Sequence, residues 1–316
     1  MKASATAVLA AALAMFPLCA MGSKSSAAEP MVLVTIKPVH SLAAAVMQGA
    51  GSPILLLDGA ASPHAYALKP SQARQLQNAG LVVRVSEGLE TFLVKPIAGL
   101  PKRVQVATLD RIDGLKLHPF RTGTALEADP HDHAGHGQGH KAAGIDPHLW
   151  LDPDNARRIG MHLAEVLGRL APEHASRYRA NAAALGTRLD QLASRLAIEL
   201  KPFAERRFLV FHDAYQYLER RFGVVAAGAV TVNPEVPPSA KRISALRARV
   251  AKGGIVCVFA EPQFPPKVID TIIEGTKAAR GTLDPLGADL AAGPDQYFML
   301  MEGLARDLSA CLGRAA

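Results

Sequence analysis

Three histidines lie in short segments that could present a metal ligand. His64 is in SPHAY (62–66), His148 in DPHLWLDP (146–153) and His212 in FHDAY (211–215). His64 and His212 each follow a predicted strand, and open α/β sheets bind ligands beyond the carboxyl ends of their strands. Imidazole nitrogen suits zinc, copper, nickel or iron better than magnesium, calcium or manganese, which prefer oxygen. Together the three histidines indicate a transition-metal site, whereas any one alone also fits an ordinary surface histidine.

A second group of histidines lies in the segment 119–145, which has no periodicity and consists mainly of Gly, Ala, Asp and His. This composition is typical of a flexible, His-rich loop. Two interpretations stay open: the loop binds further metal weakly near the main site, or it is a solvated linker. Its histidines are His131, His133, His136 and His140.

Two more polar residues follow predicted strands and are candidates for a supporting role. His40, in KPVHSL (37–42), follows the first strand, and Glu261 follows a strand predicted at 255–259. A carboxylate in that place can orient a ligand histidine. The alternatives are a polar helix-start residue for His40, which is the simpler explanation, and a structural hydrogen bond for Glu261.

The elements that would position these residues alternate between strands and helices. In the first half, strands are predicted at 32–36, 54–57, 81–85 and 104–107, with helices at 41–47 and 71–78. In the second half, strands are predicted at 208–211, 255–259 and 282–283, with helices at 214–222, at 239–250, after Pro266 and at about 295–311. Such alternation predicts parallel strands with crossover helices.

A long amphipathic helix is predicted between the two halves, after a break near Pro172. Its apolar residues recur every three or four positions, the spacing of one buried face. They are Leu185, Leu189, Leu192, Leu196 and Leu200. The helix is long for an ordinary crossover, so we expect two α/β lobes joined by it rather than one doubly wound sheet. The predicted parts are an N-terminal lobe (29–172), a linking helix (173–202) and a C-terminal lobe (203–316).

The first 28 residues have the pattern of a cleaved secretory signal peptide. A lysine follows Met1, an apolar stretch runs over 5–18, and small residues end the segment before Glu29. The stretch is too short for a membrane anchor, and we expect a soluble, exported product. Removing Lys2 and Lys24 lowers the formal net charge from +7 to +5, and the basic residues form no stripe with aromatics. Nucleic-acid binding therefore has little support.

Two cysteines, Cys257 and Cys311, remain after the predicted signal peptide. In the oxidising space outside the cytoplasm they are most simply one disulfide. Two separate buried thiols are the alternative.

Six motifs, in order over nearly the whole chain after the signal peptide, resemble those of the zinc-binding, ZnuA-type proteins of bacterial ABC importers. They are SPHAY, PHLWL, FHDAY, TVNPE (231–235), FAEPQF (259–264) and GTLDPLG (281–287). The resemblance implies two α/β lobes joined by a rigid helix, with the metal in the cleft between the lobes.

The same resemblance implies a ligand set. His64 and His148 would be ligands from the N-terminal lobe, His212 the ligand from the C-terminal lobe, and Asp284 the fourth ligand. Related manganese binders have a carboxylate at the position matched by His212, so the resemblance favours Zn²⁺. Some zinc members have a glutamate at the position of Pro63, so here Asp284 or a water must complete the tetrahedron.

The function implied by the resemblance is high-affinity zinc binding in the periplasm. The protein would be a monomer that delivers Zn²⁺ to an inner-membrane permease with a cytoplasmic ATPase, and it would not be an enzyme. One alternative is a binding protein for manganese or another divalent ion. The other is a secreted zinc hydrolase, which is disfavoured because Asp284 would fill the substrate's position and no His-Glu pair supplies a base.

Overall fold

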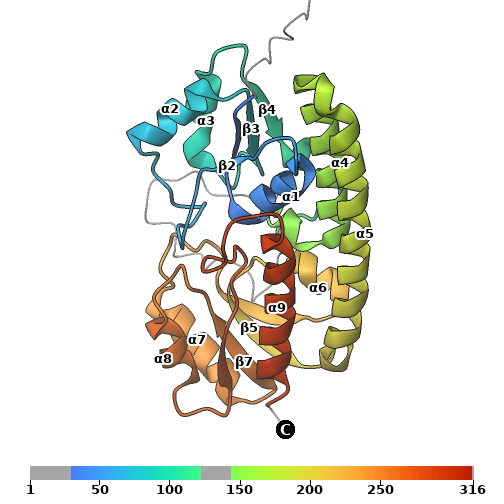
Figure 1. Ribbon diagram of the computed structural model, residues 1–316. Coiled ribbons are helices and arrows are strands. Elements are labelled where there is room, and N and C mark those ends of the chain that lie inside the picture. Colours follow the sequence, from blue (N-terminus) through green and yellow to red (C-terminus); the bar gives the residue numbers. More distant parts are fainter. Residues whose placement is uncertain (1–29, 122–143, 315–316) are drawn as a thin grey trace, which may run out of the picture.

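The computed structural model describes residues 30–121 and 144–314, which form two four-stranded parallel sheets flanked by helices (Figure 1). The predicted signal peptide (1–28) and the predicted loop histidines His131, His133, His136 and His140 lie outside the described residues. The two separate sheets confirm the predicted two-lobe α/β class, so the alternative of one continuous sheet is wrong.

The first sheet has the strand order β2-β1-β3-β4, with all pairs parallel. Strands β1 and β3 are buried along their whole length and, apart from Arg84 at the end of β3, apolar, as expected where helices cover both faces of a parallel sheet. Its strands are β1 (Val32–Val34), β2 (Ile54–Leu55), β3 (Leu81–Arg84) and β4 (Gln105–Thr108). The helices are α1 (Lys37–Met47), α2 (Pro70–Asn78) and α3 (Val94–Ala98).

The second sheet has the order β6-β5-β7-β8 and is also parallel. Its strands are β5 (Arg207–His212), β6 (Ala226–Thr231), β7 (Ile255–Ala260) and β8 (Ala279–Thr282). The helices are α6 (Gln216–Phe222), α7 (Ala240–Ala251), α8 (Lys267–Ile273) and α9 (Gln296–Leu312). Strand β6 was not predicted, because its sequence AAGAVT has little of the bulk and branching that mark a strand, and it lies at a sheet edge.

Two long helices lie between the sheets in sequence. Helix α4 (Pro153–Leu170) begins after Asp152, whose side chain accepts a hydrogen bond from the backbone of Asp154. A short turn that contains Pro172 then leads into α5 (Ala175–Leu200). With 26 residues, α5 is about 39 Å long and runs beside both lobes in Figure 1. The predicted linking helix is therefore present.

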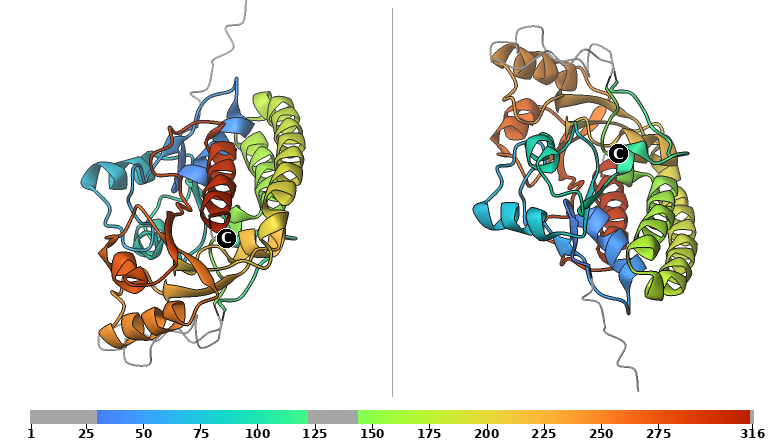
Figure 2. Two further views of the ribbon diagram at one scale, coloured as in Figure 1. Left: turned by 90° about the horizontal axis from the view of Figure 1, so that it is seen from below. Right: turned by 90° about the horizontal axis from the view of Figure 1, so that it is seen from above.

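One hydrophobic core joins the two lobes. It contains buried side chains from β1 and α1 of the first lobe, from α4 and α5, and from β5 and α9 of the second lobe. Helix α9 packs against both α1 and α5, and the views in Figure 2 show it beside the long helices. Because this core is shared, the predicted division at 172 and 203 stays a prediction.

Cys257 of β7 and Cys311 of α9 form a disulfide, which confirms the predicted pairing. It fixes the last helix to the second sheet. Within the described residues, none of the helices combines the length and the apolar character needed to span a bilayer.

Candidate metal centre

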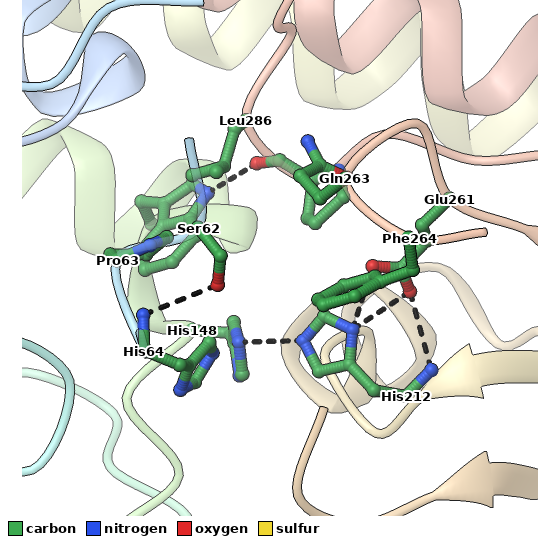
Figure 3. Close-up of a pocket in the computed structure, with 11 residues that line it drawn as sticks. Ser62, Pro63, His64, His148, His212, Glu261, Gln263, Phe264 and Leu286 are labelled. Carbon is green, nitrogen blue, oxygen red and sulfur yellow. Dashed lines mark hydrogen bonds and ion pairs between the residues drawn. The ribbon is translucent and has the colours of Figure 1, made fainter. Parts of the chain in front are cut away.

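The three predicted histidines converge from distant parts of the chain. His64 lies in the segment that follows β2, His148 comes just before a short helical turn (Leu149–Leu151), and His212 is the last residue of β5. One ring nitrogen from each lies within 4.8 Å of the others. The Nε2 atoms of His148 and His212 are 3.2 Å apart, and Figure 3 shows these rings facing each other beside His64.

Two of the rings are each oriented by a carboxylate. The Nδ1 atom of His148 is 2.8 Å from Oδ1 of Asp146, and Nδ1 of His212 lies 2.8 and 2.7 Å from the two oxygens of Glu261. Because a carboxylate only accepts hydrogen bonds, each Nδ1 carries the proton and each Nε2 presents its lone pair to the centre of the cluster. Glu261 thus contacts a candidate histidine, as one of its two predicted roles requires, and its action on a metal ligand stays a prediction.

Asp146 was missed by the sequence analysis. Its Oδ1 also accepts from the backbone N–H of His148, and its Oδ2 accepts from Gln216 of α6. The Asp-Pro-His spacing was a signal, because a side chain two residues before an N–H can accept from it. Asp146 therefore holds His148 by both its backbone and its ring.

The electrostatic surroundings of the three rings differ. Burial, and then the neighbouring rings, hold the pKa of His64 and of His148 well below the ordinary value of 6.5. Burial also opposes protonation of His212, but the Glu261 charge outweighs it, so the pKa of His212 is raised. Burial raises the pKa of Asp146 to about 6. Near neutral pH, His64 and His148 are therefore unprotonated and free to bind a cation.

Asp284 lies outside this cluster. Among the described residues, the group with converging ligand atoms contains only the three histidines. The Oδ1 atom of Asp284 accepts hydrogen bonds from Gln263 Nε2 (2.8 Å) and Leu286 N (2.9 Å), and its Oδ2 accepts from Ala288 N (2.5 Å). As a fourth ligand Asp284 stays a prediction, because it would have to reorient from these contacts.

His40 also lies apart from the three rings. It is buried in α1, where its Nε2 is 3.1 Å from the carbonyl oxygen of Pro53, and burial lowers its pKa. The structure thus gives His40 a local contact, and its auxiliary role stays a prediction.

The histidines line a small pocket whose wall contains further residues that the sequence analysis did not single out. The open volume is about 10 Å³, roughly that of one water-sized sphere. The other side chains in the wall include Trp150, Gln263 and Phe264. Such a pocket accepts a single ion rather than an organic molecule.

Comparisons with known proteins agree with this chemistry. The family model described as zinc-uptake complex component A, periplasmic, matches residues 32–311. A protein of Brucella suis named "High-affinity zinc uptake system protein ZnuA" is 43% identical over 318 residues, covering 93% of this chain and 95% of that protein.

Two solved structures share the fold. One, titled "Crystal structure of ZnuA", superposes with a TM-score of 0.72 at 24% identity and covers 90% of this chain and 99% of that one. The other is the binding protein FpvC of Pseudomonas aeruginosa in complex with Mn²⁺, with a TM-score of 0.76 at 20% identity, covering 91% and 100%. At these identities the likeness concerns the fold alone, and the fold alone does not select the metal.

Proposed function

The chain belongs to the family of periplasmic ZnuA-type zinc-uptake components, and on that premise we propose that it captures Zn²⁺ between His64, His148 and His212 and delivers it to a membrane importer. The observation that carries the proposal is the convergence of three imidazole rings, two of which are hydrogen-bonded to carboxylates through Nδ1. Membership of the family supports the high-affinity zinc-binding role.

The spacing of the ring nitrogens fits one zinc ion. Zinc binds imidazole nitrogen at about 2.0–2.1 Å in a tetrahedron, so two ligands of one ion lie about 3.3 Å apart. The two Nε2 atoms of His148 and His212 lie 3.2 Å apart. This distance is therefore close to the separation that two imidazole ligands of one zinc ion would have. A water would complete the tetrahedron while Asp284 keeps its contacts with Gln263 and the backbone, and Asp284 would be the fourth ligand only after it reorients.

Manganese is a weaker fit. The converging ligand atoms of the described residues are all nitrogen, whereas manganese prefers oxygen ligands. We therefore assign zinc as the transported ion.

Catalysis is not part of the proposed function. Pockets for small organic ligands have volumes of about 300–1,000 Å³, against about 10 Å³ here. A scissile bond could not approach an ion held by all three histidines without a large opening of the pocket. The zinc hydrolase is therefore not favoured.

The cellular setting belongs to the same proposal. We infer export by cleavage of the segment 1–28, a monomeric protein in the periplasm, and a partner composed of an inner-membrane permease and its cytoplasmic ATPase. The family description, which specifies a periplasmic component of a zinc-uptake complex, supports the setting.

Alanine substitutions test the metal site. Zinc affinity would be measured by competition with a chromophoric chelator for the wild-type protein and for His64→Ala, His148→Ala and His212→Ala. We expect each change to weaken binding by at least about a hundredfold, the cost of roughly 3 kcal/mol for one lost ligand. His162→Ala, in α4 and outside the cluster, is the matched control. Unchanged affinity in two of the three variants would contradict the proposal.

A further inference from the structure

The Asp284 carboxylate is held in place by three donors. Two are backbone N–H groups of its own loop, Leu286 and Ala288, and the third is the side-chain amide of Gln263. The carboxylate therefore acts as an acceptor that organises the turn after β8. In this arrangement its oxygens do not converge with the histidine nitrogens.

The loop that supplies the backbone donors is itself fixed by side chains from other elements. Trp150 Nε1 donates to the carbonyl of Pro285 and Gln296 Nε2 to the carbonyl of Leu286. Lys37 Nζ of α1 donates to the carbonyl of Ala288. Since these anchors fix the two backbone donors, Gln263 supplies, among the described residues, the one hydrogen bond to the Asp284 carboxylate that comes from a side chain and that a substitution can remove.

Gln263 also faces the metal pocket. It lines the same pocket as His64, His148 and His212. An ionised carboxylate only accepts hydrogen bonds, so the amide must direct its NH₂ group to Asp284. The amide oxygen of Gln263, Oε1, is buried and has no hydrogen-bond partner among the described residues. Gln263 is thus part of the pocket wall and at the same time hydrogen-bonded to the Asp284 carboxylate.

We propose that Gln263 is a positioning residue that keeps the Asp284 carboxylate away from the three imidazoles and so biases the site towards zinc over oxygen-preferring ions such as Mn²⁺. The inference rests on the proposed function of the histidine cluster. A nitrogen set of neutral imidazoles satisfies zinc, whereas manganese gains most from an added carboxylate. Holding Asp284 by the amide therefore costs manganese more affinity than zinc.

Double-variant measurements test the proposal. Zinc affinity would be measured by chelator competition, and manganese affinity by the electron paramagnetic resonance of free Mn²⁺, for Gln263→Leu, Asp284→Asn and their combination. Leucine removes the amide donor at similar volume, and asparagine keeps one acceptor for the loop while removing the charge. Gln191→Leu, an exposed site on α5, is the matched control.

We expect Gln263→Leu to lower the ratio of zinc to manganese affinity by about tenfold, through tighter manganese binding, and Gln191→Leu to leave it unchanged. The gain should vanish in the combined variant, because it depends on the Asp284 charge. Gln263→Asn, which shortens the amide beyond reach of Asp284, should reproduce the effect if leucine disturbs folding. A ratio that stays at the wild-type value in both Gln263 variants, or a manganese gain that persists without the Asp284 charge, would overturn the proposal.

The same experiment separates this inference from the function on which it rests. If the histidine cluster were not the zinc site, wild-type protein would not bind one zinc ion per chain and His148→Ala would leave zinc binding intact. If only the role of Gln263 is wrong, zinc binding and its loss in His148→Ala persist while the metal ratio does not respond to Gln263.

Discussion

At the residue scale, the site depends on carboxylates that fix which nitrogen of each imidazole carries the proton. Glu261 contacts Nδ1 of His212 through both oxygens and is almost completely buried. A neutral ring held in this way directs its Nε2 lone pair into the pocket and becomes a stronger donor to a metal. The binding strength of His212 therefore depends on a residue that need not touch the ion.

Glu261→Gln should weaken zinc binding by about ten- to a hundredfold, the usual effect of losing a carboxylate behind a ligand histidine. The amide can still accept from Nδ1, so the ring stays in place while the charge is lost. Competition titration measures the effect, and Glu165→Gln, an exposed site on α4, is the control. An affinity equal to that of the wild type would show that the Glu261 charge does not act on the metal site.

Zinc affinity should fall as the pH is lowered. Just below the pKa of His212, each zinc ion that binds should displace one proton, the one on His212. The pKa of His212 is raised above 6.5, so its proton must leave when zinc binds below that pKa, whereas His64 and His148 stay neutral. Each pH unit below the pKa of His212 should then weaken binding by about tenfold. Below about pH 6 the Asp146 carboxyl is protonated as well, so a second proton is then linked to zinc binding.

Chelator competition at a series of pH values, corrected for the chelator's own protonation, measures this slope. A slope near three just below pH 6.5 would mean that all three rings are protonated together. A flat profile from pH 8 to 5.5 would exclude histidine ligation altogether.

The sequence pointed to the three histidines that the fold brings together and to Glu261, because each follows or adjoins a predictable element and lies in a family motif. Their roles at a metal ion stay predictions. The sequence was not sufficient for Asp146, which makes its contacts through a local turn, or for Gln263, whose partner lies 21 residues away on a loop. Contacts of this kind depend on the directions in which side chains point in the folded chain, and the spacing of residues along the sequence does not specify these directions.

At the element scale, parallel strands bring His212 and Glu261 together, because β5 and β7 are neighbours and both residues lie at their carboxyl ends. The alternating pattern predicted most of these strands and the long helix. The start of α1 at Lys37 rather than at residue 41 was missed, since Pro38 occupies a first-turn position that tolerates proline. Element boundaries therefore depended on turn and cap chemistry more than on periodicity.

The disulfide between β7 and α9 makes a prediction at this scale. Replacing both Cys257 and Cys311 with alanine should lower the free energy of unfolding by about 4 kcal/mol, from the loop-closure entropy of the unfolded chain, since the two residues are 54 apart. Guanidinium unfolding of the purified protein measures it, with reduced wild type as the comparison. Equal stability of the variant and the oxidised wild type would contradict the prediction.

At the scale of the whole molecule, the shared core opposes a wide opening of the lobes. Tyr297 of α9 donates through its hydroxyl to the carbonyl of Trp150 and through its backbone N–H to Ser41 of α1. Lys37 of α1 reaches the carbonyls of Ala288 and Leu290. These contacts cross between the lobes close to the metal pocket, so we expect zinc to order local segments rather than to drive a hinge.

Small-angle scattering of the protein with and without zinc should therefore give nearly the same radius of gyration. We expect about 19 Å in both states, with a difference below about 0.5 Å. Zinc added to the His148→Ala, His212→Ala double variant is the control. A contraction of more than about 1 Å on zinc binding would indicate a hinge motion that the shared core should prevent.

Three imidazoles from distant parts of the chain are proposed to bind one zinc ion, and everything else said of the site depends on this. X-ray absorption at the zinc edge, on protein loaded with one equivalent of zinc, reports the ligands themselves. We predict a four-coordinate shell at about 2.0–2.1 Å with the outer-shell scattering of three imidazole rings, and the scattering of one ring should disappear in His148→Ala. A six-coordinate oxygen shell, or scattering from fewer than two imidazoles in the wild type, would contradict the prediction.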